Sequence, residues 1–404
     1  MFGIVKRCAV MIAAAMLIVF AINSAERPEL RDFPYPYSAM LTLQSHIDGS
    51  TDEEFETIHH YLNVELGLDV GDSMWMYNLN DGISYRDGDS FDPGAYMTWF
   101  LGGSEEPNSA ELIKKYWDLN YIDSIHTVGD FSRIGGDVAF TRELAERAYR
   151  TMNENGIYPT VWINHGTETN VQNLGGYMPF RFTSYQRGDD PKSEYYHADL
   201  MCKAGVQFVW NSINDVRLGM KDPLFPIFLR DGQKLWGFKA YTGYDQDGEY
   251  MYMWSPYNLT EILTGENLDK LVENREFSII ANHFGSSDVN EMLCEGNRYA
   301  LQLLKKYQDE GKILVSRSSK LLRYAEVRKY VKFEKNGDDI NILSIADPML
   351  GEYAPEYEHL RGITFYVDDA DSAVLRLLGE IVPEELVQRN PADETGQESI
   401  GFVW

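Results

Sequence analysis

Short apolar runs alternate with amphipathic segments over most of this chain. Runs such as 38–45, 123–128 and 158–164 have the length and residue types typical of buried β-strands. Between them, segments such as 110–119 and 140–156 repeat apolar residues every three or four positions, which predicts amphipathic helices. Strict alternation of this kind favours an α/β fold of parallel strands covered by helices.

The pattern predicts further elements along the same lines. Strands are expected at 38–45, 73–79, 123–128, 158–164, 206–211, 226–230, 235–241, 277–283 and 313–316. Helices are expected from 50 to about 66 and at 110–119, 140–156, 198–204, 267–273, 290–310 and 318–329. Thr51 and Glu54 have capping-box spacing, which marks the start of the first helix. Seven or eight parallel strands are enough to close a barrel, so we expect a (β/α)7-8 barrel over residues 38–330.

The two ends of the chain differ from this central region. Residues 26–37 are polar and proline-rich and predict a lead-in segment. From 331 to 404, strand-like runs at 330–334, 340–345, 362–367 and 374–378 are separated by turns rich in Asn, Gly and Asp. No helical period is found there, so we expect a small antiparallel β appendage.

The first 25 residues have the pattern of a secretory signal. Lys6 and Arg7 precede an apolar run at 8–22, and small and polar residues follow it. The run is shorter than the roughly 20 residues of a membrane span. This pattern predicts cleavage after Ala21 or Ala25, which would give a secreted, periplasmic or cell-surface protein. The alternative is an uncleaved signal anchor, in which case the protein would be attached to a membrane.

Composition narrows the classes of partner. A net charge of −27 argues against nucleic acid, because phosphate binding needs a basic face. The aromatic fraction of 13% suits a carbohydrate-binding cleft or, more commonly, a large core. Cys202 and Cys294 could form one disulfide or stay as thiols, and their spacing does not indicate a zinc site. Kinase, serine esterase and dehydrogenase motifs are absent from the sequence.

Histidines follow four of the strand-like runs, at positions 46, 126, 165 and 283. Side chains at the C-terminal ends of successive parallel strands meet at one mouth of a barrel. Asp48 lies on the same face of the extended chain as His46, and Asp130 follows His126 by four residues. Imidazoles and carboxylates gathered in this way predict a metal or acid–base site.

Polar residues that follow the other strands are expected at the same mouth of the barrel. Asp215 follows the strand at 206–211 and is a candidate general base. The segment after 158–164 is unusually polar, and its side chains could bind sugar hydroxyl groups. The candidate substrate-binding residues are Asn164, His165, Glu168, Trp210, Arg230 and Asp231.

The order of these motifs over residues 38–320 resembles that of the polysaccharide deacetylase family, carbohydrate esterase family 4, in its wider deformed-barrel superfamily. Ser45-His46-Ile47-Asp48-Gly49 is similar to the family's Thr-Phe-Asp-Asp-Gly motif. His126 and Asp130 occupy the places of its His-x-x-x-His motif, and Asn282-His283 is similar to its Leu-x-His motif.

The resemblance implies a deformed barrel and a set of roles. Asp48, His126 and Asp130 would bind a divalent ion, and His283 would be the catalytic acid. The mixture of imidazole and oxygen donors itself favours zinc, with manganese, nickel or cobalt as alternatives. The chain departs from the family at Ile47, where the family has its general base. His46, His165 or Asp215 would have to replace that base. Asp130 in place of a histidine would favour harder ions, and the family's Arg-x-Pro-Tyr motif is not evident.

Three functional hypotheses remain open from the sequence. The first is a secreted metal-dependent hydrolase that removes N- or O-acetyl groups from a polysaccharide or glycoconjugate, with His46 or Asp215 as base. The second is a glycoside hydrolase that uses paired carboxylates, such as Asp48 and Asp215, without a metal. The third is a barrel that binds glycan and catalyses nothing, which the missing base at Ile47 would favour.

Overall fold

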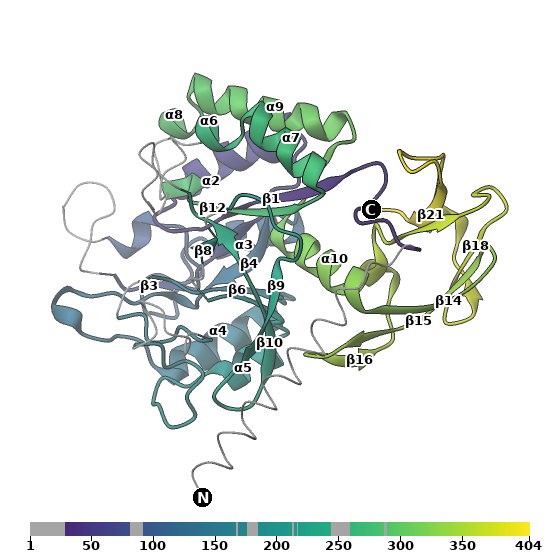
Figure 1. The fold of residues 1–404 in the computed structure, drawn as a ribbon. Coiled ribbons are helices and arrows are strands. Elements are labelled where there is room, and N and C mark those ends of the chain that lie inside the picture. The colour runs from purple at the N-terminus through teal and green to yellow at the C-terminus, as the bar shows by residue number, and fades with distance from the viewer. Residues whose placement is uncertain are drawn as a thin grey trace, which may run out of the picture. The chain divides into compact units, whose positions relative to one another are not determined.

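The computed structural model describes residues 29–80, 92–166, 169–175, 185–211, 214–215, 217–243, 259–286 and 289–404. At residues 134, 214, 215 and 286 it describes the backbone alone. The predicted signal at 1–25 and the candidate Glu168 lie outside these ranges. The chain forms two compact units (Figure 1). The α/β unit comprises 36–323 with 348–350, and the β unit comprises the described residues before 36 together with 324–347 and 351–404.

Parallel strands form most of two sheets in the α/β unit, as the alternating pattern predicts. The first sheet has the order β13-β1-β12-β11-β8, and the second has the order β2-β4-β6-β7-β10-β9. In the first, the fully buried β1 (Ala39–Ser45) lies between β13 (Ile313–Val315) and β12 (Phe277–Asn282). β11 (Ala240–Tyr241) pairs with the other edge of β12, and β8 (Asn214–Asp215) follows β11. The second contains β2 (Asp72–Met74), β4 (Ile122–His126), β6 (Val161–Ile163), β7 (Phe208–Trp210), β10 (Lys234–Phe238) and β9 (Leu224–Phe228).

The two sheets stay open in the part of the chain that the structure describes, so the predicted barrel closure is not confirmed. The strand predicted at 235–241 is two strands, because the chain leaves the second sheet after β10 and joins the first at β11. The strand predicted at 73–79 is also divided, into β2 and β3 (Tyr77–Asn78), and β3 pairs with β5 (Gly129–Asp130).

One strand of the second sheet departs from the predicted parallel arrangement. β9 runs antiparallel to β10 and lies at the edge of the sheet. It contains Pro226, which has no N–H to donate and is tolerated at a sheet edge.

Helices cover both sheets. α2 (Asp52–His59) begins at Thr51, where the predicted capping box with Glu54 is confirmed, and it continues as a π-helical turn at His60–Glu65. The helix predicted at 290–310 is two helices, α8 (Val289–Met292) and α9 (Glu295–Asp309). The other helices are α3 (Ala110–Asp118), α4 (Arg142–Glu154), α5 (Ala198–Lys203), α6 (Leu259–Ile262), α7 (Gly265–Asn274) and α10 (Ser318–Tyr330).

Two apolar clusters hold these layers together. One joins residues of the second sheet, such as Ile125 and Trp162, to Ala148 on α4. The other joins Leu41 on β1 to Leu301 on α9, and α6, α7, α8 and α9 lie together beside β1 and β12 (Figure 1). Among the described residues, no helix is long and apolar enough to span a membrane.

The β unit contains two sheets. The first has β14 (Val331–Asn336), β15 (Asp339–Asp347), β16 (Gly351–Tyr353), β18 (Val374–Leu377) and β19 (Glu380–Ile381), and the second has β17 (Thr364–Val367), β20 (Val387–Asn390) and β21 (Glu398–Phe402). Most pairs are antiparallel, as predicted. β15 and β18 are parallel, because the chain between them crosses over through β16 and β17.

Candidate metal centre

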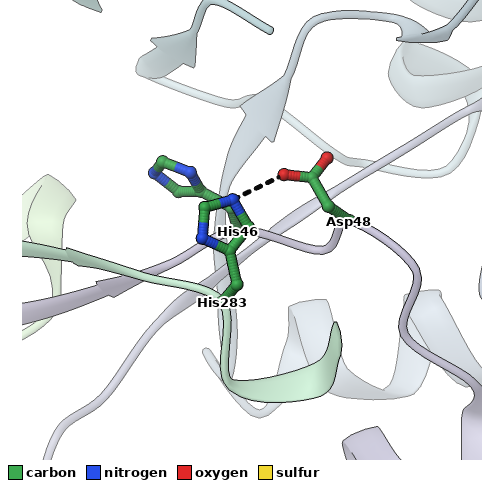
Figure 2. A group of neighbouring side chains, drawn as sticks. All are labelled: His46, Asp48 and His283. Atoms are coloured by element: carbon green, nitrogen blue, oxygen red, sulfur yellow. Dashed lines mark ion pairs between the residues drawn. The ribbon is translucent and has the colours of Figure 1, made fainter. Parts of the chain in front are cut away.

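The first sheet brings His46 and His283 to the same level. Ser45 at the end of β1 pairs with Asn282 at the end of β12 in a parallel register. The residues that follow, His46 and His283, therefore leave adjacent strands together, and their ring centroids are 4.8 Å apart. Asp48 lies two residues after His46. The side chains of His46, Asp48 and His283 form one group whose ligand atoms are close enough to hold an ion (Figure 2).

The second sheet contributes two more imidazoles. His126 is the last residue of β4 and pairs with Ile163 at the end of β6. His165 lies two residues beyond Ile163, and its Nδ1 is 2.9 Å from His126 Nε2. Asp48 from the first sheet reaches this pair, so that Asp48, His126 and His165 form a second group of side chains able to hold an ion.

The carboxylate of Asp48 is the centre of the cluster. Its Oδ1 lies 3.2 Å from His126 Nε2 and 3.2 Å from His165 Nδ1, and its Oδ2 lies 2.8 Å from His283 Nε2. Among the described residues, neither oxygen has a hydrogen-bond partner of acceptable geometry. The ring nitrogens are therefore close to the carboxylate without being aligned as donors to it, as expected for ligands that converge on a shared point.

Burial and charge set the protonation of the cluster. All five side chains are buried. Burial by itself would raise the pKa of Asp48, but the neighbouring His126 and His165 hold that pKa well below its usual value. Burial lowers the pKa of His46 well below its usual value and also lowers the pKa of His126. Asp48 is therefore ionised and these two imidazoles are neutral, which are the states that bind metal ions.

Asp130 lies behind His165 and outside both groups. Its Oδ2 is 3.5 Å from His165 Nε2, on the side of the ring opposite Asp48. Asn80 donates to the same oxygen at 2.8 Å, and the backbone N–H of Ser132 donates to Oδ1 at 2.9 Å. Burial would lower the pKa of His165, but the charges of Asp48 and Asp130 raise it to about 10. Asp130 thus lies at the far nitrogen of the ring, where outer carboxylates orient metal-binding histidines, although Nε2 has no hydrogen-bond partner of acceptable geometry among the described residues.

The residues present suit a divalent cation. Imidazole nitrogens and one carboxylate are the donors that zinc prefers, and manganese, nickel and cobalt also accept them. The ionised carboxylate of Asp48 is buried, so a cation would compensate charge that is removed from water, and its binding would displace the proton that the raised pKa of His165 keeps on that ring.

Buried polar side chains that the sequence did not single out hold these loops in place. Trp75 Nε1 donates to the backbone carbonyl of His126 at 2.5 Å, and its ring stacks on the same imidazole. Gln172 accepts from Val128 N–H at 3.0 Å and donates to the carbonyl of Gly129 at 2.6 Å. The signal for such residues in the sequence is weak: the polar run after position 164 points to Gln172, and nothing comparable points to Trp75.

Ile47, Trp210 and Asp215 are candidate positions outside the cluster of imidazoles and Asp48. Ile47 is buried, and its N–H donates to Ser73 Oγ at 2.9 Å. The ring of Trp210 packs 5.1 Å from that of His46. Asp215 belongs to β8, and its side chain is not described.

Three of the other candidates take part in hydrogen bonds that brace the fold. Asn164 accepts from Trp162 Nε1 and donates to the carbonyl of Leu174, both at 2.8 Å. The guanidinium of Arg230 binds the buried carboxylate of Asp189, and Asp231 accepts from the hydroxyl of Tyr196 at 2.9 Å. Cys202 and Cys294 are both free thiols.

Comparison with known proteins gives little guidance. No family model and no curated protein matches the chain. Solved structures do match, among them one described as a "putative polysaccharide deacetylase from Mycobacterium smegmatis". It has 12% sequence identity and a TM-score of 0.38, and the match covers 74% of this chain and 94% of that one.

Proposed function

We propose that this chain is a metal-dependent hydrolase that removes acyl groups, N- or O-acetyl, from a glycan outside the cytoplasm. The observation that carries the proposal is the buried Asp48 carboxylate, with imidazoles from two sheets against its oxygens. The order of motifs along the sequence, which resembles that of the polysaccharide deacetylase family, supports the choice of an acyl group as the target.

Asp48, His126 and His165 would hold the ion, because their ligand atoms are the closest set in the cluster. When bound, such an ion lowers the pKa of a water molecule and polarises an acyl carbonyl group. Asp130 would hold His165 with its Nδ1 toward the ion, acting through His165 Nε2. His165 thus takes the place in the ligand set that the sequence pattern gives to Asp130.

His46 and His283 would move protons on the other side of Asp48. His46 is neutral because burial lowers its pKa, so it can accept a proton from the attacking water. His283, whose Nε2 lies 2.8 Å from Asp48 Oδ2, would donate the proton to the leaving amine or alkoxide. Trp210, packed against His46, would help to exclude bulk water.

The test uses the full chain, stripped with a chelator and reloaded with zinc, manganese, nickel or cobalt. Acetate release from N-acetylated and O-acetylated glycan oligomers should require the ion. Asp48→Asn should lose both ion and activity, whereas His60→Ala, a change at an exposed histidine, should keep both. Full activity of Asp48→Asn, or activity that survives the chelator, would refute the proposal, and sugar release without metal would point to a glycoside hydrolase.

A further inference from the structure

The Asp48 carboxylate faces two separate pairs of imidazoles. On the Oδ1 side are His126 and His165, both from the second sheet. On the Oδ2 side are His283, at 2.8 Å, and His46, both from the first sheet (Figure 2). Each pair completes its own group of three ligand atoms, which lie within 4.8 Å of one another, and Asp48 belongs to both groups.

A carboxylate shared in this way can serve two ions, one on each oxygen, as in the two-metal sites of many hydrolases. We propose that the centre holds a second divalent ion, bound by His46, His283 and Oδ2 of Asp48, beside the ion that Asp48, His126 and His165 hold. The inference rests on the proposed function for the first ion and adds a ligand role for His46 and His283.

The geometry gives the two positions different affinities. In the first set, the three ligand atoms lie 2.9 to 3.2 Å from one another, so little rearrangement is needed to enclose an ion. In the second set only the contact between His283 and Asp48 is equally close. His46 Nε2 also lies 3.4 Å from Gln44 Oε1, and the ring must adjust to bind an ion. The second ion therefore binds more weakly than the first.

Occupancy of the second position has a consequence for the reaction. An ion there takes up the nitrogen lone pairs of His46 and His283, and a ligated imidazole cannot accept a proton at that nitrogen. These are the groups to which proton transfer is assigned above. Activity should therefore rise as the first ion binds and fall as excess ion fills the second position.

Binding stoichiometry tests the inference on the chelator-treated full chain. Isothermal titration with zinc, supported by elemental analysis after dialysis, should give two ions per chain in two steps of unequal affinity. His283→Ala and His46→Gln should each retain only the tighter step, and His126→Ala should lose the tighter step. His60→Ala, which removes an exposed imidazole, should still bind two ions. Circular dichroism of each variant checks that it is folded.

The outcomes separate this inference from the proposed function. One ion per wild-type chain at saturation, unchanged in both His283→Ala and His46→Gln, would overturn the second site and leave the hydrolase proposal standing. Two ions that persist in both variants would also overturn it. No bound ion under any loading condition would overturn both proposals.

Discussion

His197 should make the α/β unit less stable in mild acid. The ring is buried among Phe140, Tyr149 and Trp162. Its Nε2 donates to the backbone carbonyl of Gln172 at 2.8 Å, and among the described residues Nδ1 has no hydrogen-bond partner. Protonation of Nδ1 would place a charge in the core with no hydrogen-bond acceptor for the new N–H among the described residues, and Asp199 and Asp189 offset the burial only in part. Gln172 also braces the loop that carries His126, so the contact matters for the candidate metal centre.

The magnitude follows from the pKa of this imidazole. Burial lowers the pKa of His197 from 6.5 to about 4 in the folded chain. Between these values the unfolded chain binds a proton that the folded chain does not, so stability falls as the pH falls. The contribution is complete above about pH 6.5 and is lost by about pH 4. A shift of this size corresponds to about 3 kcal/mol, at roughly 1.4 kcal/mol for each pH unit.

Urea unfolding of the full chain between pH 7 and pH 4, followed by tryptophan fluorescence in the presence of a chelator, measures this effect. His197→Gln keeps a donor for the Gln172 carbonyl but cannot be protonated. The variant should therefore gain about 3 kcal/mol relative to wild type as the pH falls from 7 to 4. The carboxylates that titrate in this range are common to both chains and cancel in the difference. A difference in unfolding free energy that stays constant across these pH values would refute the reasoning.

Three further changes test other parts of the molecule. Asp393→Asn should destabilise the β unit by about 3–5 kcal/mol in urea unfolding, because the fully buried Arg31 would lose the carboxylate that its Nε contacts at 2.8 Å. Gly129→Ala should cost at least about 1–3 kcal/mol, since a Cβ would lie 2.1 Å from a carbonyl oxygen of the neighbouring β3. Asp130→Asn should weaken zinc binding by roughly 10–100-fold in titration calorimetry, because the charge that orients His165 is removed.

The first two of these changes have matched control variants. Asp371→Asn alters an exposed carboxylate of the β unit and should change stability by less than about 0.5 kcal/mol. Gly166→Ala adds a Cβ in open space at ordinary φ and should be neutral. For Asp130→Asn the control is urea unfolding of the chelated chain: some stability should be lost, because an amide can accept from only one of the two donors Asn80 and Ser132, and zinc affinity of the folded chain should fall in addition. If Asp130→Asn loses stability but binds zinc as tightly as wild type, Asp130 does not orient His165 for the ion.

The sequence was a good guide wherever a local pattern decides the outcome. The capping box at Thr51 fixes the start of α2, and the apolar run of β1 fixes a strand buried on both faces. Placing His46 and His283 at the ends of strands was enough to expect them together, because adjacent parallel strands end at one edge. The parallel register of β1 and β12 then brings them to the same level.

Features that depend on contacts between distant parts of the chain could not be predicted from local sequence patterns. Spacing suggested Asp130 as an ion ligand, but its carboxylate lies behind the ring of His165, and only the paths of β5 and β6 decide which of the two faces Asp48. The crossing between sheets at Lys239 falls within a continuous strand-like run. The ion pair of Arg230 with the buried Asp189, 41 positions earlier in the chain, could not be predicted from spacing, and the role of Arg230 in substrate binding stays a prediction.

The place of β1 in its sheet determines how long this strand waits for its partner strands during synthesis. β1 is the first described strand of the α/β unit to leave the ribosome. Its two sheet neighbours, β12 and β13, are the last strands of that unit to be made. At about 5–20 residues per second, the roughly 230 residues between β1 and β12 take about 12–46 s. For that time a strand whose residues are all buried in the fold has no native partner and is a target for chaperones or for aggregation. Translation speed and chaperone supply, as much as the final stability, should therefore govern the yield of folded protein.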